Sequence, residues 1–123
     1  MKIYRFDREV AHPITQFDSV NVAIGRVGRF DEQFQVGCFH FEPGGVVGFH
    51  EATFPQLFMV VAGEGWVRGE EPERTPIRPG QAAFWDTGEW HESGSETGMT
   101  AVVVESPALD PTRHMPELEP VEG

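Results

Sequence analysis

The sequence predicts a single all-β domain, a small barrel or sandwich of short strands with little helix. A chain of 123 residues fits one domain. Its 14 glycines and 10 prolines stand singly between short apolar runs, which is typical of many short strands joined by tight turns. No apolar stripe with the period of a helix extends beyond about ten residues. A closed barrel would also remove the strand edges that these apolar runs would otherwise expose.

The first half of the chain contains four candidate strands. They are residues 1–6, 21–25, 34–41 and 46–52. The third is expected to end at Pro43-Gly44-Gly45, because proline donates no backbone hydrogen bond and glycine permits a sharp turn. The segment between the first two strands is mixed in character, and His12-Pro13 within it marks a turn or an extended stretch.

The second half continues the same pattern. Its candidate strands are residues 56–62, 66–68, 82–85, 91–93 and 100–105. The first two are separated by Gly63-Glu64-Gly65 and are therefore predicted to form a hairpin over 56–68. The last strand is apolar on both faces, as expected of a core strand. We expect the barrel domain to span residues 1–106 and the Pro- and Glu-rich tail, residues 107–123, to be irregular.

The charge of the chain argues against nucleic acid and membrane partners. The formal net charge is −11, and an acidic protein repels phosphate groups. There is no basic amphipathic segment, no apolar segment near the N-terminus, and no apolar run approaching the ~18 residues of a membrane span. A cytoplasmic location is therefore expected. Cys38 is the only cysteine, so no disulfide forms within the chain, and we expect it to be a buried small hydrophobe.

Two segments carry glycine and polar residues at characteristic spacings. The first has Gly44, His50, Ala52, Gln56 and Gly63, and the second has Gly80, Asp86, Gly88, His91 and Ser95. Over about residues 36–105 they resemble the two motifs of the cupin superfamily, G-x5-H-x-H-x3,4-E-x6-G and G-x5-P-x-G-x2-H-x3-N. The resemblance implies a jelly-roll β-barrel with one interior site.

The resemblance also implies where a metal would bind. In metal-binding cupins the positions of His50, Ala52, Gln56 and His91 hold three histidines and one glutamate, which bind one divalent metal. This chain departs twice, because Ala52 replaces a histidine and Gln56 replaces the glutamate. The remaining His50, Gln56 and His91 supply two imidazoles and one carbonyl oxygen, a set that can hold Fe, Mn, Ni or Zn with reduced affinity. A bound carboxylate or anionic substrate would supply the missing charge.

A metal-free cavity is the alternative, with the two histidines hydrogen-bonded to Gln56. Phe58 and Val60 share strand parity with Gln56 and are expected to line the same interior. His40 has the parity of Cys38, so it faces either the core or the pocket. The expected pocket lining is Ala52, Phe58, Val60 and His40.

Three functions remain open from the sequence, and no catalytic residue is assigned. The first is a metal-dependent enzyme, since cupins of this size include dioxygenases, isomerases and lyases. The second is a non-catalytic module that binds a small, oxygen-bearing molecule. The third is a barrel whose surface or dimer interface matters most, and likeness of fold alone does not choose among them. The resemblance also implies a homodimer, because single-domain cupins commonly dimerise, often by exchanging an N-terminal strand. The β-prone Ile3-Tyr4-Arg5-Phe6 is compatible with such an exchange.

Overall fold

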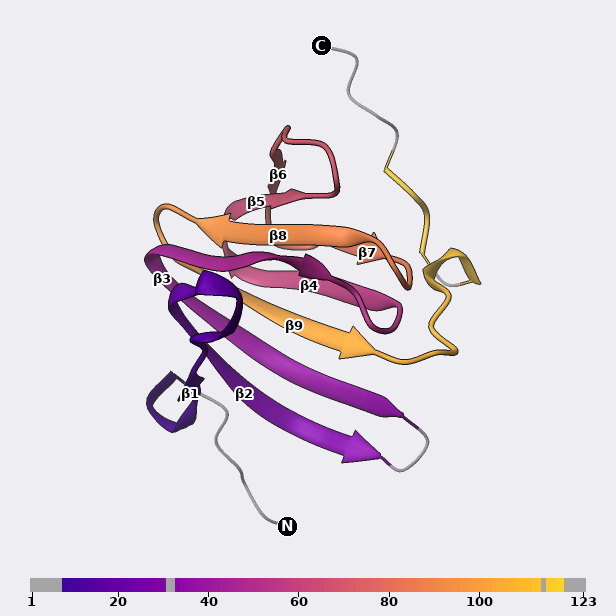
Figure 1. Cartoon of the computed structure of the whole chain (residues 1–123), viewed down its shortest axis with the longest axis horizontal. Helices are drawn as coiled ribbons and strands as arrows, with labels where there is room; N and C mark the ends of the chain where they lie inside the picture. The colour runs from indigo at the N-terminus through magenta and orange to yellow at the C-terminus, as the bar shows by residue number, and fades with distance from the viewer. Residues whose placement is uncertain (1–7, 31–32, 114, 119–123) are drawn as a thin grey trace.

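The computed structural model describes residues 8–30, 33–113 and 115–118. Their backbone forms one antiparallel sheet that curls into a nearly closed jelly-roll barrel, so the predicted all-β fold is confirmed (Figure 1). Helical structure in these residues is limited to three 3-10 turns, η1 Arg8–Val10, η2 Gln16–Asp18 and η3 Pro111–Arg113. None of the described segments forms a helix with the length and hydropathy needed to span a bilayer.

Nine strands make up the described part of the barrel. They are β1 His12–Pro13, β2 Val20–Phe30, β3 Phe34–Glu51, β4 Gln56–Gly63, β5 Gly65–Arg68, β6 Thr75–Ile77, β7 Ala82–Trp85, β8 Trp90–Ser95 and β9 Met99–Glu105. The main order across the sheet is β6-β5-β8-β3-β9-β4-β7, and β2 pairs with both β3 and β1. β3 therefore holds the sheet together, because β2, β8 and β9 all pair with it.

The predicted strands 34–41 and 46–52 are one continuous strand, β3. Its first part pairs with β9 from Gln35 to Phe41, and its second part pairs with β8 from Gly45 onward. The predicted break at Pro43 thus falls where β3 changes partners, and a proline there removes no ladder hydrogen bond. Gly45 is required at this corner, because a Cβ there would lie 2.4 Å from the backbone oxygen of Asn21.

The predicted hairpin over 56–68 is wrong. β4 pairs with β7 and β9, whereas β5 pairs with β6 and β8. A strand has only two hydrogen-bonding edges, and both edges of β4 are already occupied. The turn at Gly63-Glu64-Gly65 therefore carries the chain across the barrel rather than back along β4. Gly63 has a φ of +72°, which favours glycine at this crossing.

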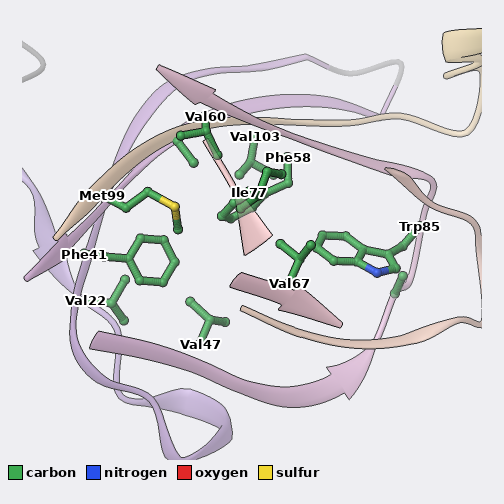
Figure 2. Close-up of a cluster of buried hydrophobic side chains, with 12 residues drawn as sticks. Val22, Phe41, Val47, Phe58, Val60, Val67, Ile77, Trp85, Met99 and Val103 are labelled. Atoms are coloured by element: carbon green, nitrogen blue, oxygen red, sulfur yellow. The ribbon is translucent and has the colours of Figure 1, made fainter. Parts of the chain in front are cut away.

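The interior of the barrel is filled by apolar side chains from most of the strands. Phe41 and Phe58 are almost fully buried and meet edge to face, with ring centroids 6.0 Å apart. Figure 2 shows Phe41, Met99 and Val60 grouped in one part of this cluster and Trp85 at the opposite side. Trp85 is the last residue of β7, and it contacts both this apolar cluster and the imidazole of His91.

Three other expectations concern the ends of the chain and its cysteine. The predicted strand 1–6, which contains the segment proposed for dimer exchange, lies outside the described residues. In the described part of the predicted tail, the only element is η3. Cys38 is fully buried, as predicted, and burial raises the pKa of its thiol above the ordinary value.

Candidate functional site

His50 and His91 lie side by side on neighbouring strands. His50 is near the end of β3 and His91 is near the start of β8, and the two are direct partners in the antiparallel register. Their ring centroids are 4.3 Å apart, at an interplanar angle of 55°. An irregularity in the register between Val47 and His50 separates this pair from the rest of the β3–β8 ladder. Two histidines 41 positions apart in the sequence are thus brought into contact by one strand pairing.

Aromatic rings cover the outer faces of this pair. Trp85 stacks on His91 with centroids 4.4 Å apart and an interplanar angle of 21°. Phe17, in the turn η2, stacks on His50 with centroids 4.1 Å apart and an angle of 9°. The four rings form a row that we call the ring stack: Phe17, His50, His91 and Trp85. Because the imidazole faces are covered, the two histidines can meet a ligand only through their ring edges.

One hydrogen bond fixes the tautomer of His50. Its Nδ1 lies 2.7 Å from the backbone oxygen of Gly48. A carbonyl oxygen only accepts, so Nδ1 donates its proton and Nε2 carries the lone pair of the neutral ring. A histidine held in this way by a backbone carbonyl is oriented for metal or ligand binding through the other nitrogen.

His91 is buried and neutral at physiological pH. Only 3% of its surface is exposed. Burial lowers the pKa of His91 from 6.5 to about 4, and the charge of a protonated His50 is the second cause of this shift. A weaker interaction with the backbone of Glu89 acts in the opposite direction and raises the pKa. The Glu89 oxygen already accepts a hydrogen bond from Ala52 N–H at 2.8 Å, and Nδ1 of His91 is buried without a partner of good geometry. A buried nitrogen without a partner is costly and is a candidate for contact with a ligand.

Gln56 is held in place by a carboxylate. Its Nε2 donates a hydrogen bond of 2.6 Å to Oε1 of Glu105, its register partner on β9, and Gln56 is 8% exposed. The amide nitrogen must point to the carboxylate, so the amide oxygen is the end left for another partner. On its other side Gln56 is in register with Trp85, which stacks on His91. Gln56 therefore lies at the same end of the barrel as the ring stack.

The remaining predicted pocket residues are divided between two places. Ala52, Phe58 and Val60 belong to the buried core cluster, and Ala52 contributes only a methyl group where the family motif has an imidazole. His40 lies on the opposite face of β3 from Phe41, in a separate cavity of about 300 Å³. This cavity is bordered by the N-terminal segment and β2, so His40 is not part of the ring stack.

The donor set can be tested against the metal that the resemblance implies. Among the described residues, no group of three or more His, Cys, Asp or Glu side chains is placed to hold an ion. His50, His91 and Gln56 instead offer two neutral imidazoles and one amide oxygen. Nδ1 of His91 has no hydrogen-bond partner of good geometry, and the contact of His50 with Gly48 uses only one of its two ring nitrogens. Two imidazoles and one amide oxygen are donors of a kind that would hold a divalent transition metal only weakly.

Three residues of this site were not found from the sequence. Trp85 lies in the short apolar run 82–85, which predicts a strand but does not indicate which of its faces is interior. Glu105 has the parity of the buried Ala101 and Val103 on β9, so its inward direction could have been read from strand alternation. Phe17 carried no signal, because it adopts a left-handed backbone, with φ 60° and ψ 32°, in an irregular segment.

Comparison with solved structures shows the same barrel in several proteins. A cupin-like protein from Thermotoga maritima matches with a TM-score of 0.72 and 16% identity, over 83% of this chain and 82% of that one. KdgF from Halomonas sp. matches with a TM-score of 0.68 and 20% identity, over 87% and 97%. A predicted oxalate decarboxylase from Thermotoga maritima matches with a TM-score of 0.64 and 17% identity, over 82% and 96%. At these identities the likeness is one of fold.

Comparison with curated protein sequences gives no match. The family model of the cupin domain, however, matches residues 37–106, which is more than half of the chain. These residues contain both motif segments, the histidine pair and Gln56. The chain belongs to the cupin family.

Proposed function

We propose that this barrel binds one divalent transition metal together with a small oxygen-bearing ligand at His50, His91 and Gln56. The observation that carries the proposal is the pair of adjacent imidazoles with unused nitrogen atoms. His91 needs no deprotonation at neutral pH, since the pKa of its imidazole lies near 4. Neutral imidazole is the form that binds transition metals.

The ligand that completes the site is expected to be an anion with oxygen donors. None of the three protein donors carries a charge, so the double charge of a metal would be left without compensation inside the barrel. The Glu105 carboxylate accepts a hydrogen bond from the amide nitrogen of Gln56, so it would orient the amide oxygen and would not itself bind the metal. A bound metal would polarise an oxygen of this ligand as a Lewis acid. Trp85 and Phe17 exclude water from the ring faces, and a dioxygenase, isomerase or lyase reaction would occur at the remaining edge.

A calorimetric titration tests this proposal. Protein freed of metal is titrated with Zn²⁺ or Ni²⁺, with and without malonate as a model dicarboxylate. We expect one ion per chain, tighter binding with malonate, and loss of binding in His50→Ala and His91→Ala. His12→Ala is the matched control, because His12 is exposed on β1 and distant in register from the pair. Binding that survives both His50→Ala and His91→Ala would contradict the proposal.

Restoring the family donors gives a second test of the same site. The double variant Ala52→His with Gln56→Glu supplies the missing imidazole and carboxylate. If the four positions converge, Zn²⁺ affinity should rise, because a third imidazole and an anionic oxygen join the donors. No gain in a folded double variant would mean that these positions do not surround one point.

A metal-free binding site is the second candidate function. It is favoured by the small donor set, since the described residues offer no group of three metal-binding side chains. The free nitrogen of His50 and the amide oxygen of Gln56 would then accept hydrogen bonds from a hydroxylated ligand. In the titrations above, this function predicts no Zn²⁺ binding by the wild type and new Zn²⁺ binding by the double variant.

A further inference from the structure

We propose that a cavity on the outside of the barrel binds a small zwitterion, a molecule that carries both a carboxylate and an ammonium group on a short apolar body. This cavity, which we call the outer cavity, lies between the N-terminal segment and strands β2 and β3, and its volume is about 300 Å³. Ligand pockets in proteins range from roughly 300 to 1,000 Å³, so the outer cavity suits a small molecule.

The outer cavity is separate from the histidine pair. His40 lines it and is 6% exposed. His40 and Phe41 are consecutive residues of β3 and therefore point to opposite faces, and Phe41 belongs to the core cluster inside the barrel. The outer cavity thus lies on the other side of the sheet from the interior site, and the proposal does not depend on metal binding there.

One wall of the outer cavity is apolar and is held by strand pairing. Ile14 and Ala23 belong to this wall, and both are half-buried. The backbone N–H of Ile14 donates a hydrogen bond of 3.0 Å to the backbone oxygen of Val22, and Pro13 of β1 is in register with Ala23 of β2. These contacts fix the N-terminal segment against β2. The cavity is therefore pre-formed, and its apolar wall can bury the hydrocarbon part of a ligand.

Two opposite charges line the outer cavity without neutralising each other. Arg8 and Glu42 both line it, and they form no ion pair with each other. Instead, Nη2 of Arg8 donates a hydrogen bond of 3.4 Å to the backbone oxygen of Phe41, the residue before Glu42. This contact holds the guanidinium beside β3 and uses one of the five N–H groups that a guanidinium carries. The cavity therefore presents a cation and an anion separately.

An irregularity in β2 adds a polar side chain to the wall. Asn21 lines the cavity at the position where the pairing of β2 with β3 shifts, between Val20 and Val22. Its φ is 53°, in the left-handed region that residues other than glycine rarely adopt. Bulges and strained backbone of this kind are concentrated near binding sites. An amide side chain can donate to a carboxylate and accept from an ammonium group.

This combination favours a ligand that carries both charges. A guanidinium forms strong paired hydrogen bonds with a carboxylate, and the Glu42 carboxylate attracts an ammonium group. A simple anion would be repelled by Glu42, and a simple cation would be repelled by Arg8. An α-amino acid with an aliphatic side chain supplies both charges and also contacts the apolar wall.

Titrations with three probes of similar shape test the need for both charges. Isotope-labelled protein is followed by amide NMR during titration with L-leucine, with isovalerate, which lacks the ammonium group, and with isoamylamine, which lacks the carboxylate. We expect L-leucine to shift the amide signals of Asn21, Ala23 and Glu42 saturably. The other two probes should bind about 3- to 10-fold more weakly. No saturable shift with L-leucine, or equal binding of either single-charge probe, would overturn the proposal.

Variants at the two charged residues test which group each of them binds. Arg8→Gln and Glu42→Gln should each weaken L-leucine binding by about 3- to 10-fold. Glu42→Gln should also strengthen the binding of isovalerate, because it removes a repulsion, and Arg8→Gln should do the same for isoamylamine. Both side chains are exposed, so these changes leave the core intact. Unchanged L-leucine binding in either variant would contradict the proposal.

The matched controls are Arg78→Gln and Glu96→Gln. They remove the same charges at exposed positions that do not line the outer cavity, so L-leucine binding should equal that of the wild type. A loss of binding in both controls would indicate general electrostatic attraction and would overturn the site. The double variant His50→Ala with His91→Ala should keep its L-leucine binding. If the wild type binds L-leucine but not Zn²⁺, the metal-binding function fails and the outer site stands.

Discussion

At the scale of single residues, the pair of Gln56 and Glu105 shows how this chain departs from the family motif. The motif places a carboxylate at position 56, whereas here the carboxylate is on β9 and holds the amide of Gln56 at 2.6 Å. The negative charge has thus moved one strand away from the histidine pair. A hydrogen bond to a charged partner at this distance is among the stronger ones in proteins.

Gln56→Glu alone should destabilise the protein at neutral pH. Two carboxylates would face each other where a hydrogen bond now lies, and one of them must take up a proton or lose its partner. We expect the free energy of unfolding at pH 7 to fall by about 1–3 kcal/mol. Much of the loss should be recovered at pH 5, where one carboxyl group can donate to the other. Urea denaturation at the two pH values measures both effects.

The control for this prediction is the exchange of the two side chains. In Gln56→Glu with Glu105→Gln, one amide again faces one carboxylate, so the stability at pH 7 should return most of the way to that of the wild type. A single variant Gln56→Glu as stable as the wild type at pH 7 would mean that the contact with Glu105 contributes little.

The sequence was informative about the histidines and silent about their surroundings. Glycine and histidine spacing pointed to His50 and His91, and the strand register makes them direct partners. Spacing says nothing about which ring covers an imidazole, because that depends on turns and on neighbouring strands. Trp85 reaches His91 from β7, and Phe17 reaches His50 through two left-handed residues. Binding of metal or ligand at this site stays a prediction.

At the scale of elements, the crossing between β4 and β5 determines how the barrel closes. Gly63 ends β4 with a φ of +72°, and a Cβ there would lie 2.2 Å from the backbone oxygen of Gly98. Both the conformation and the space at this position therefore call for glycine. Gly80 has a φ of +88°, and a Cβ there would meet nothing within 4 Å, so it isolates the effect of conformation alone.

Gly63→Ala should therefore cost more stability than Gly80→Ala. A side chain in the left-handed region costs roughly 1–2 kcal/mol, which is the whole expected effect at Gly80. Forcing a methyl group against backbone adds about 1–3 kcal/mol at Gly63. Urea denaturation of both variants gives the difference in unfolding free energy. Equal losses would show that the chain near Gly98 shifts freely and that the crossing is not tightly packed.

Strand positions were predicted better than strand partners. The apolar runs that predicted strands at 82–85 and 100–105 correspond closely to β7 and β9. The hairpin over 56–68 was wrong because hydrophobic alternation marks which residues are extended and does not record which edges are free. β3 was divided in two for a related reason: Pro43 marks a change of pairing partner within one continuous strand.

At the scale of the whole molecule, acid acts on this protein in two opposite ways. The chain carries a net charge of −11 at pH 7, so protonating its carboxylates reduces repulsion within the folded state. The interior behaves differently, because His91 is buried beside His50 and resists protonation. The net pH dependence of stability therefore combines a surface effect with the protonation of one buried ring, and only a comparison of variants separates the two.

Stability should fall with acid because of His91. The pKa of His91 is lowered from 6.5 to about 4 in the folded state, so between these values the unfolded chain binds more protons. The stability that comes from keeping His91 neutral is fully present above pH 6.5 and is lost as the pH falls towards 4. At ~1.4 kcal/mol per pH unit, the whole loss is about 3 kcal/mol. In urea denaturation at pH 7 and pH 4.5, the wild type should lose about 2–3 kcal/mol more than His91→Gln. His12→Gln, which changes an exposed histidine, should follow the wild type. Parallel losses in the wild type and His91→Gln would show that His91 is protonated in the folded barrel at an ordinary pH, and that the ring stack shields it far less than its burial indicates.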